Sequence, residues 1–163
     1  RIGLKQSIKK AQLLNCTIRR NIEIGEVLAL AQEQSKKFSA ATKEDYDRFQ
    51  ALYNQLFTRQ KAATYGIYTP SGQLVASCVL FFSHKRIYYI LAGNHPKGRT
   101  MGASQLLINS FIKDNAGQDI LLDFEGSDVR SLAFFYSSFG STAELYVGIK
   151  LNKLPKIIQL FKE

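Results

Sequence analysis

The chain has 163 residues, of which 45% are apolar, and it carries a net charge of +9. This length and composition suit one domain with its own hydrophobic core. There is no run of eighteen apolar residues and no charged start followed by an apolar stretch, so we expect neither a membrane span nor a signal peptide.

The positive charge is concentrated at the start of the chain. Residues 1–20 contain six basic side chains and no acidic one, whereas the other 143 residues contain 16 basic and 13 acidic ones. Such a basic segment suits nucleic acid, an acidic lipid surface or an acidic partner, and it also suits a plain solvated helix face. The first residue is not a methionine, so the chain can be the later part of a longer protein.

Few residues are available for metal or redox chemistry. The two cysteines, Cys16 and Cys78, form no CxxC pair, and we expect buried thiols in a reducing, cytoplasmic setting. The two histidines, His84 and His95, have no second histidine or cysteine nearby. We therefore expect no metal site.

Hydrophobic periodicity divides the chain into helices and strands. Helices are expected at residues 2–14, 24–38, 42–60, 102–115, 128–139 and 154–161. Strands are expected at residues 16–20, 62–69, 73–83, 86–93, 120–124 and 143–151. Short turns make residues 62–93 an antiparallel meander, and the helix before residue 120 implies one parallel crossover. The predicted class is therefore α+β, a three-layer arrangement with helices on both faces of a mixed sheet.

A basic, glycine-bearing loop is expected where the meander ends. Residues 93–100, GNHPKGRT, match the phosphate-loop pattern GxxxxGK[ST] except that Arg99 stands in the lysine position. A planar guanidinium does not replace a compact ammonium freely, and an antiparallel meander does not precede the loop in such nucleotide hydrolases. Nucleotide binding of this kind is a remote alternative.

An overlapping pattern indicates a different phosphate site. Residues 99–104, RTMGAS, follow [Q/R]xxGx[G/A], in which N–H groups at a helix start hold a pyrophosphate. The match fails at its last position, where Ser104 replaces glycine or alanine. Serine is small, so the fit is weakened rather than lost.

The motifs that follow, in this element order, resemble a known superfamily. The sequence DFEGS at residues 123–127, followed by AFFYSSFG at residues 133–140, resembles the Fem-like branch of the GNAT acyltransferases. The basic helix and strand within residues 8–20 are similar to that branch as well. In it a first GNAT-like domain precedes a second. The resemblance thus implies a junction over residues 1–22 and a GNAT-like domain over residues 23–163.

The resemblance implies where the substrates bind. The strands at residues 86–93 and 120–124 would splay apart, and the pantetheine arm of acetyl-CoA or another acyl-CoA would lie between them. The main chain of one strand would bind that arm, through Leu91, Ala92 and Gly93. The pyrophosphate would lie on the helix start, at Arg99, Thr100, Met101, Gly102 and Ala103. Fem-like enzymes instead take an aminoacyl group from charged tRNA, which the basic opening would suit.

Acyl transfer to an amine needs little beyond placement, a base and an acid. A lysine-like amine is only about one part in 10³ neutral at pH 7, so a base has to remove its proton. We expect Glu125 to be this base, with Asp123 as the alternative, although Glu125 equally suits the role of a helix-start carboxylate. Tyr136 is the expected acid, and it equally suits a core position on the apolar stripe of its helix.

The sequence therefore predicts an N-acyltransferase that moves an acyl group directly from acyl-CoA to an amine on a small molecule or peptide. A catalytically inactive binding domain of the same fold and aminoacyl transfer from tRNA stay open as alternatives. No sequence feature names the acceptor.

Overall fold

The computed structural model describes residues 2–36, 40–125 and 129–145. The helices are α1 (Ile2–Leu13), α2 (Ile24–Ser35), α3 (Lys43–Thr58), α4 (Pro96–Met101), α5 (Ala103–Asp114) and α6 (Arg130–Ser137). The strands are β1 (Thr17–Arg20), β2 (Ala62–Tyr68), β3 (Leu74–Ser83), β4 (Arg86–Asn94) and β5 (Leu121–Asp123). None of the described helices is long and apolar enough to cross a membrane.

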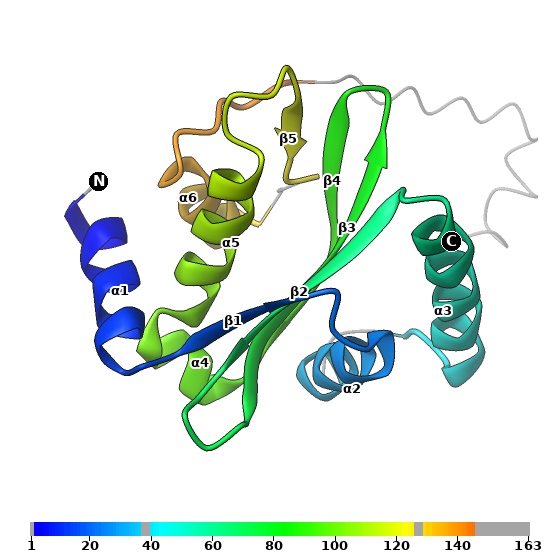
Figure 1. The fold of residues 1–163 in the computed structure, drawn as a ribbon, viewed down its shortest axis with the longest axis horizontal. Helices are drawn as coiled ribbons and strands as arrows, with labels where there is room; N and C mark the ends of the chain where they lie inside the picture. The colour runs from blue at the N-terminus through cyan, green and yellow to red at the C-terminus, as the bar shows by residue number, and fades with distance from the viewer. Residues whose placement is uncertain (1, 37–39, 126–128, 146–163) are drawn as a thin grey trace, which may run out of the picture.

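The described strands form one sheet in the order β1-β2-β3-β4-β5. The first four pair antiparallel, and β5 pairs parallel with β4 after the crossover through α4 and α5 (Figure 1). A parallel pair requires such a crossover because the chain has to return to the same end of the sheet. The predicted α+β class with a mixed, mostly antiparallel sheet is confirmed.

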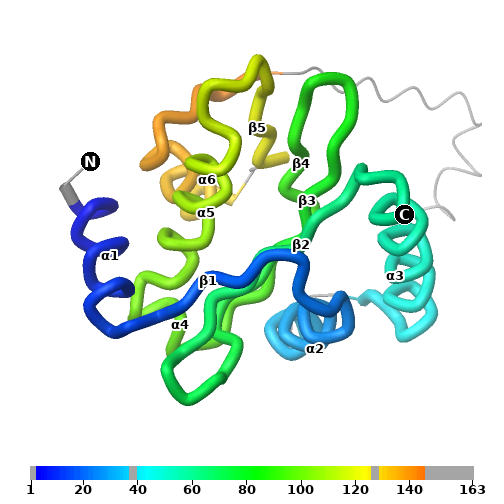
Figure 2. The backbone as a smooth tube through the Cα atoms, viewed as in Figure 1, coloured from blue at the N-terminus to red at the C-terminus, as the bar shows by residue number. Residues whose placement is uncertain are grey.

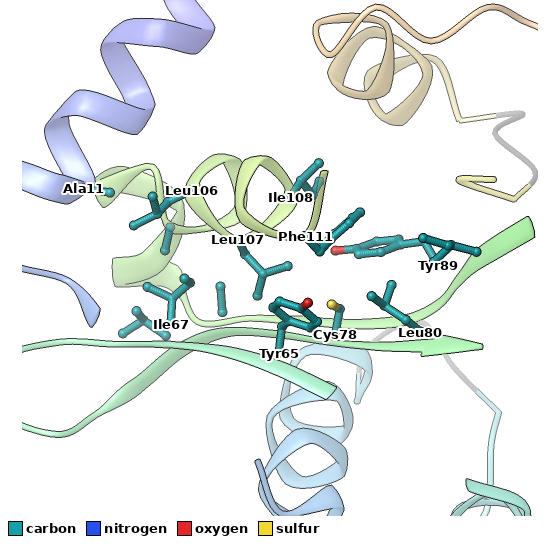
Figure 3. Packing of buried hydrophobic residues seen from close by; sticks show 14 residues of the cluster. Ala11, Tyr65, Ile67, Cys78, Leu80, Tyr89, Leu106, Leu107, Ile108 and Phe111 are labelled. Carbon is teal, nitrogen blue, oxygen red and sulfur yellow. The ribbon is translucent and has the colours of Figure 1, made fainter. Parts of the chain in front are cut away.

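Helices cover both faces of this sheet, as the tube trace also shows (Figure 2). On one face, here called the α5 face, α5 packs on the sheet through a core that includes Tyr65, Leu80 and Phe111 (Figure 3). Helices α1 and α6 add Ala11 and Tyr136 to that side. On the opposite face, here called the α2 face, α2 and α3 pack on a second apolar cluster.

Local sequence explains the helices of the α2 face. Thr42 and Asp45 form the expected capping box, since each side chain accepts a hydrogen bond from the other residue's backbone N–H. Val27, Leu28 and Ala31 of α2 are buried, as their spacing predicts. Helix α3 buries Tyr53 and half-buries the other members of its apolar stripe, Tyr46, Phe49 and Leu56.

Strand β1 belongs to the same sheet as the rest of the chain. It pairs with β2 over four residues, and Arg20 forms an ion pair with Asp114 at the end of α5, with Nε and Oδ2 2.6 Å apart. Helix α1 packs beside α5, and its Ala11 is fully buried. A junction at residue 22 with a preceding domain stays a prediction.

Three sequence predictions about elements need comment. The predicted open loop over residues 93–100 is wrong, because β4 continues to Asn94 and residues 96–101 form α4. Leu121 of β5 is 48% exposed, so this strand is not covered on both faces by the described residues as its apolar sequence predicts. The strand predicted at 143–151 and the helix at 154–161 lie almost wholly outside the described residues.

Candidate acyl-transfer site

Strands β4 and β5 touch over a short length only. Their register pairs Arg86 with Leu121, Ile87 with Leu122 and Tyr88 with Asp123. Strand β4 then continues for six more residues, to Asn94, without a further partner on that side among the described residues. The free edge of β4 presents main-chain N–H and C=O groups that a bound chain-like ligand can pair with.

A β-bulge marks the start of this free edge. Across the β3–β4 ladder, Tyr89 pairs with Leu80 and Leu91 pairs with Val79, so Ile90 is the extra residue. Bulges re-aim the chain and occur often beside active sites. Ile90 is 37% exposed, whereas its neighbour Tyr89 is buried.

The next three residues of β4 use their side-chain positions for packing. Leu91 contacts the cluster of the α2 face, and Ala92 contacts the cluster of the α5 face. A Cβ on Gly93 would lie 3.0 Å from the backbone nitrogen of Ala31, so glycine lets α2 pack closely on β4. The side-chain positions of these three residues are therefore occupied by packing, and only their main-chain groups can contact a ligand.

The two glycines of the predicted phosphate loop are explained by packing. A Cβ on Gly98 would overlap the carbonyl oxygen of Val75 in β3. A Cβ on Gly102 would overlap the carbonyl oxygen of Ser7 in α1, and Gly102 also has a positive φ of 79°. Glycine is required at both positions whether or not a phosphate binds there.

Helix α4 also changes which amides can reach a phosphate. The N–H of Arg99 donates to His95, and that of Gly102 donates to Arg99, so both are used inside the turn. Ala103, at the start of α5, is fully buried. The side chain of Arg99 is exposed. Arg99 can therefore contact a phosphate through its guanidinium but not through its backbone amide.

Asp123 and Glu125 lie at the end of β5 and differ in how their carboxylates are hydrogen-bonded. The Asp123 carboxylate accepts hydrogen bonds from Arg86 Nη1, at 3.2 Å, and from the backbone N–H of Glu125, at 2.9 Å. Glu125 is exposed and has a positive φ of 63°. Asp123 therefore holds the strand end in place, and Glu125 is the less engaged of the two carboxylates.

Tyr136 lies where β4 and β5 separate. Its ring stacks on Phe124, just beyond β5, with centroids 4.5 Å apart, and meets Tyr89 of β4 edge to face at 6.3 Å. Burial raises the pKa of the Tyr136 hydroxyl above its ordinary value, so the phenol stays protonated at neutral pH. This hydroxyl has no hydrogen-bond partner among the described residues.

Comparison with known families decides the classification. The model of the acetyltransferase (GNAT) domain family matches residues 4–129, more than three quarters of the chain. The chain belongs to this family. No curated protein sequence matches the chain significantly.

Solved structures of low sequence identity share this GNAT fold. A putative acetyltransferase from Pyrococcus furiosus is 17% identical, with a TM-score of 0.62, and the match covers 84% of this chain and 99% of that one. An aminoglycoside antibiotic 6′-N-acetyltransferase from Acinetobacter baumannii is 15% identical, with a TM-score of 0.60 and coverage of 84% and 98%. FemX is 12% identical with a TM-score of 0.69; the match covers 85% of this chain but only 53% of FemX.

In this GNAT domain the candidate acid Tyr136 and the alternative base Asp123 lie on opposite faces of the sheet. Tyr136 packs on the α5 face, whereas Asp123 is in register with Tyr88, which lies beside Leu56 of α3 on the α2 face. Partners in register point their side chains to the same face of a sheet. A group held between β4 and β5 would thus meet a carboxylate on one side and a phenol on the other.

Sequence reasoning missed a polar chain at the end of β4. The N–H of Asn94 donates to Gln34 Oε1 of α2, at 2.6 Å, and Ser104 of α5 donates to Asn94 Oδ1. The one sequence feature that pointed to these hydrogen bonds was Ser104, which departs from the [Q/R]xxGx[G/A] pattern. Its hydroxyl is turned to Asn94, which links both helical layers at the end of the free edge.

The histidines and cysteines take no part in this arrangement. His95 caps α4, accepting a hydrogen bond from the N–H of Lys97 at 3.2 Å, and His84 lies in the β3–β4 turn. Burial raises the pKa of the Cys78 thiol, which keeps it protonated and unreactive. No group of three potential metal ligands occurs among the described residues.

Proposed function

We propose that this chain is an N-acyltransferase that moves an acyl group from an acyl-CoA thioester directly to an amine. The observation that carries the proposal is the short contact between β4 and β5, beyond which the edge of β4 is free in the described part of the chain. Membership of the GNAT acetyltransferase family supports this choice of donor.

The residues present fit such a donor. The main chain of Leu91, Ala92 and Gly93 can pair with the amides of a pantetheine arm as a neighbouring strand would. Lys97 and Arg99 are exposed and form no ion pair with the described acidic residues, so their charges are available to phosphate oxygens. We place the main-chain contribution to phosphate binding at Ser104 and Gln105, whose N–H groups begin α5 and which are only partly buried. In this proposal the amides of Ser104 and Gln105 bind the phosphate in place of the predicted amides of Arg99 and Gly102. Thr100, Met101 and Ala103 shape the turn.

Acyl-CoA supplies, when bound, an acyl group on a thiolate leaving group. Glu125 accepts the proton that the attacking amine has to lose, since such an amine is almost fully protonated at pH 7. Tyr136 holds a proton on the α5 face of the sheet and donates it to the departing sulfur. Cys78 is fully buried and both cysteines are free thiols. The burial of Cys78 excludes it as a nucleophile, which favours direct transfer of the acyl group. The free thiols are compatible with the cytoplasmic location that we propose.

Calorimetry tests the donor. We expect acetyl-CoA to bind and ATP not to bind. Arg99→Ala should weaken acetyl-CoA binding by about 1.5–3 kcal/mol, the contribution of a hydrogen bond to a charged group. Arg48→Ala is the matched control, because Arg48 pairs with Glu44 on the exposed side of α3 and should not matter. A wild-type chain that binds neither ligand would refute acyl-CoA as the donor, which leaves an inactive binding domain or the tRNA candidate below.

Aminoacyl transfer from charged tRNA is the second candidate. Lys5, Lys9 and Lys10 of α1 and both arginines of β1 are exposed, which gives a basic surface beside α5. We propose, in this case, that the chain is the second GNAT-like domain of a longer protein, in the Fem-like branch. Tight tRNA binding that falls steeply with salt, together with no affinity for acetyl-CoA, would favour this candidate over the first.

A further inference from the structure

An open groove lies on the α2 face. Its volume is about 440 Å³, and it is open to solvent along its length rather than enclosed. The walls come from the end of α3, from β3 and from β4. Their apolar residues are Leu56, Phe81, Tyr88 and Ile90, together with Phe82, whose side chain packs against the cluster of the α5 face.

The groove begins where the two strands of the candidate site separate. Tyr88 is the last β4 residue paired with β5, and Ile90 is the bulge residue that follows. Both line the groove. A molecule in the groove therefore lies next to the free edge of β4, on the face opposite Tyr136.

The charge around the groove is one-sided. Lys61 is its one charged lining residue; it is exposed and has no ion-pair partner among the described residues. No acidic residue lines the groove. The nearest carboxylate by register, Asp123, is already paired with Arg86. Such a lining favours an apolar body with a carboxylate and disfavours a molecule with several positive charges.

We infer that this groove binds the acceptor, and that the acceptor is a small amine with an apolar or aromatic body and a carboxylate, as in a hydrophobic amino acid. This inference rests on the proposed function and names the substrate class of its second site. The aromatic walls bury the body, and Lys61 binds the carboxylate at the groove's edge. The amine is then directed toward the free edge of β4.

The reaction balances with the groups already named. The amine nitrogen attacks the thioester carbonyl carbon, a C–N bond forms, and the C–S bond breaks with its electron pair on sulfur. The ammonium first loses one proton to Glu125, which passes it to solvent, and the attacking nitrogen then loses a second proton to Glu125 as the amide forms. The sulfur gains one proton from Tyr136, so the reaction releases one proton overall. The products are an N-acyl amino acid and free CoA, and solvent returns both side chains to their starting states.

The test compares two ligands that differ in the carboxylate alone. Phenylalanine and 2-phenylethylamine are titrated into the protein, and the resonances of Tyr88 and Ile90 are followed by NMR. We expect phenylalanine to bind about 5- to 10-fold more tightly, and Lys61→Ala to remove this difference without changing the affinity for 2-phenylethylamine. Lys61→Arg should keep the preference. Lys43→Ala, which removes the same charge about 20 Å away at the other end of α3, should leave it unchanged.

The same proteins are then assayed for acetyl transfer from acetyl-CoA. We expect Lys61→Ala to raise the KM for phenylalanine while kcat stays near the wild-type value. Equal binding of the two ligands, a preference for an aminoglycoside, or no effect of Lys61→Ala would overturn the inference. Absence of acetyl-CoA binding would refute the proposed function instead, and the NMR titration would still decide whether the groove binds this class of amine.

Discussion

Replacing Gly102 by alanine separates two explanations of the glycine in the RTMGAS motif. Gly102 has a φ of 79°, and a Cβ there would overlap the carbonyl oxygen of Ser7 in α1. Gly117 is a matched control, because its φ is 81° and nothing lies within 4 Å of a Cβ added to it. The pair therefore isolates the contact with α1 from the backbone strain.

The expected magnitudes follow from this geometry. A left-handed alanine costs about 1–2 kcal/mol, and the stiffer unfolded chain returns about 0.4–1 kcal/mol. Gly117→Ala should thus lower the free energy of unfolding by about 0.5–1 kcal/mol. In Gly102→Ala the overlap with a backbone atom of α1 adds about 1–3 kcal/mol, as overpacking does, for a total of about 1.5–4 kcal/mol.

Urea unfolding of the two variants and the wild type measures both values. Acetyl-CoA binding, measured under conditions where each variant is folded, completes the comparison. If Gly102→Ala is no less stable than Gly117→Ala and yet loses acetyl-CoA binding, the glycine serves the phosphate rather than the packing of α1. Our reasoning about the α4–α5 turn would then be refuted.

Three further predictions concern stability, acid catalysis and the polar chain at the end of β4. Arg20 donates a hydrogen bond to Asp114 and holds the pKa of that carboxyl below its ordinary value. The stabilisation from this ion pair is therefore present above about pH 3.9, and it is lost as the pH falls through the lower pKa of the folded state. Asp114→Asn should cost about 1 kcal/mol at pH 7, and its stability should converge with that of the wild type in acid; parallel curves would contradict this. Tyr136→Phe should lower kcat about 10²-fold with an unchanged Kd for acetyl-CoA, and an unchanged kcat would exclude Tyr136 as the acid. Ser104→Ala should weaken acetyl-CoA binding, because Asn94 loses its partner in α5; tighter binding, as a better match to the motif, would show that the link is dispensable.

Much of the architecture is readable from local patterns. The helical stripes of residues 24–35 and 43–58 depend on neighbours in sequence, so their burial follows from the period alone. The same holds for the capping box at Thr42. The strands of the meander follow from continuous apolar runs bounded by turn residues. Helix α4 escaped prediction because its six residues contain a glycine and no apolar period. Its start is stabilised by Pro96 and by the His95 cap, which are weak signals in isolation.

The site depends on contacts between segments far apart in the chain. The sequence by itself determined the order of the described elements apart from α4, the basic start, and the choice of Glu125, Arg99 and Tyr136 as candidate residues. Only the tertiary structure decided that β5 leaves β4 after three pairs, that Ile90 bulges there, and that Lys61 meets Tyr88 across one groove. A glycine in a motif does not reveal whether a ligand or a helix lies against it, because a Cβ would be excluded in both cases. At Gly102 the neighbour is Ser7, ninety-five positions earlier, and only folding brings the two together.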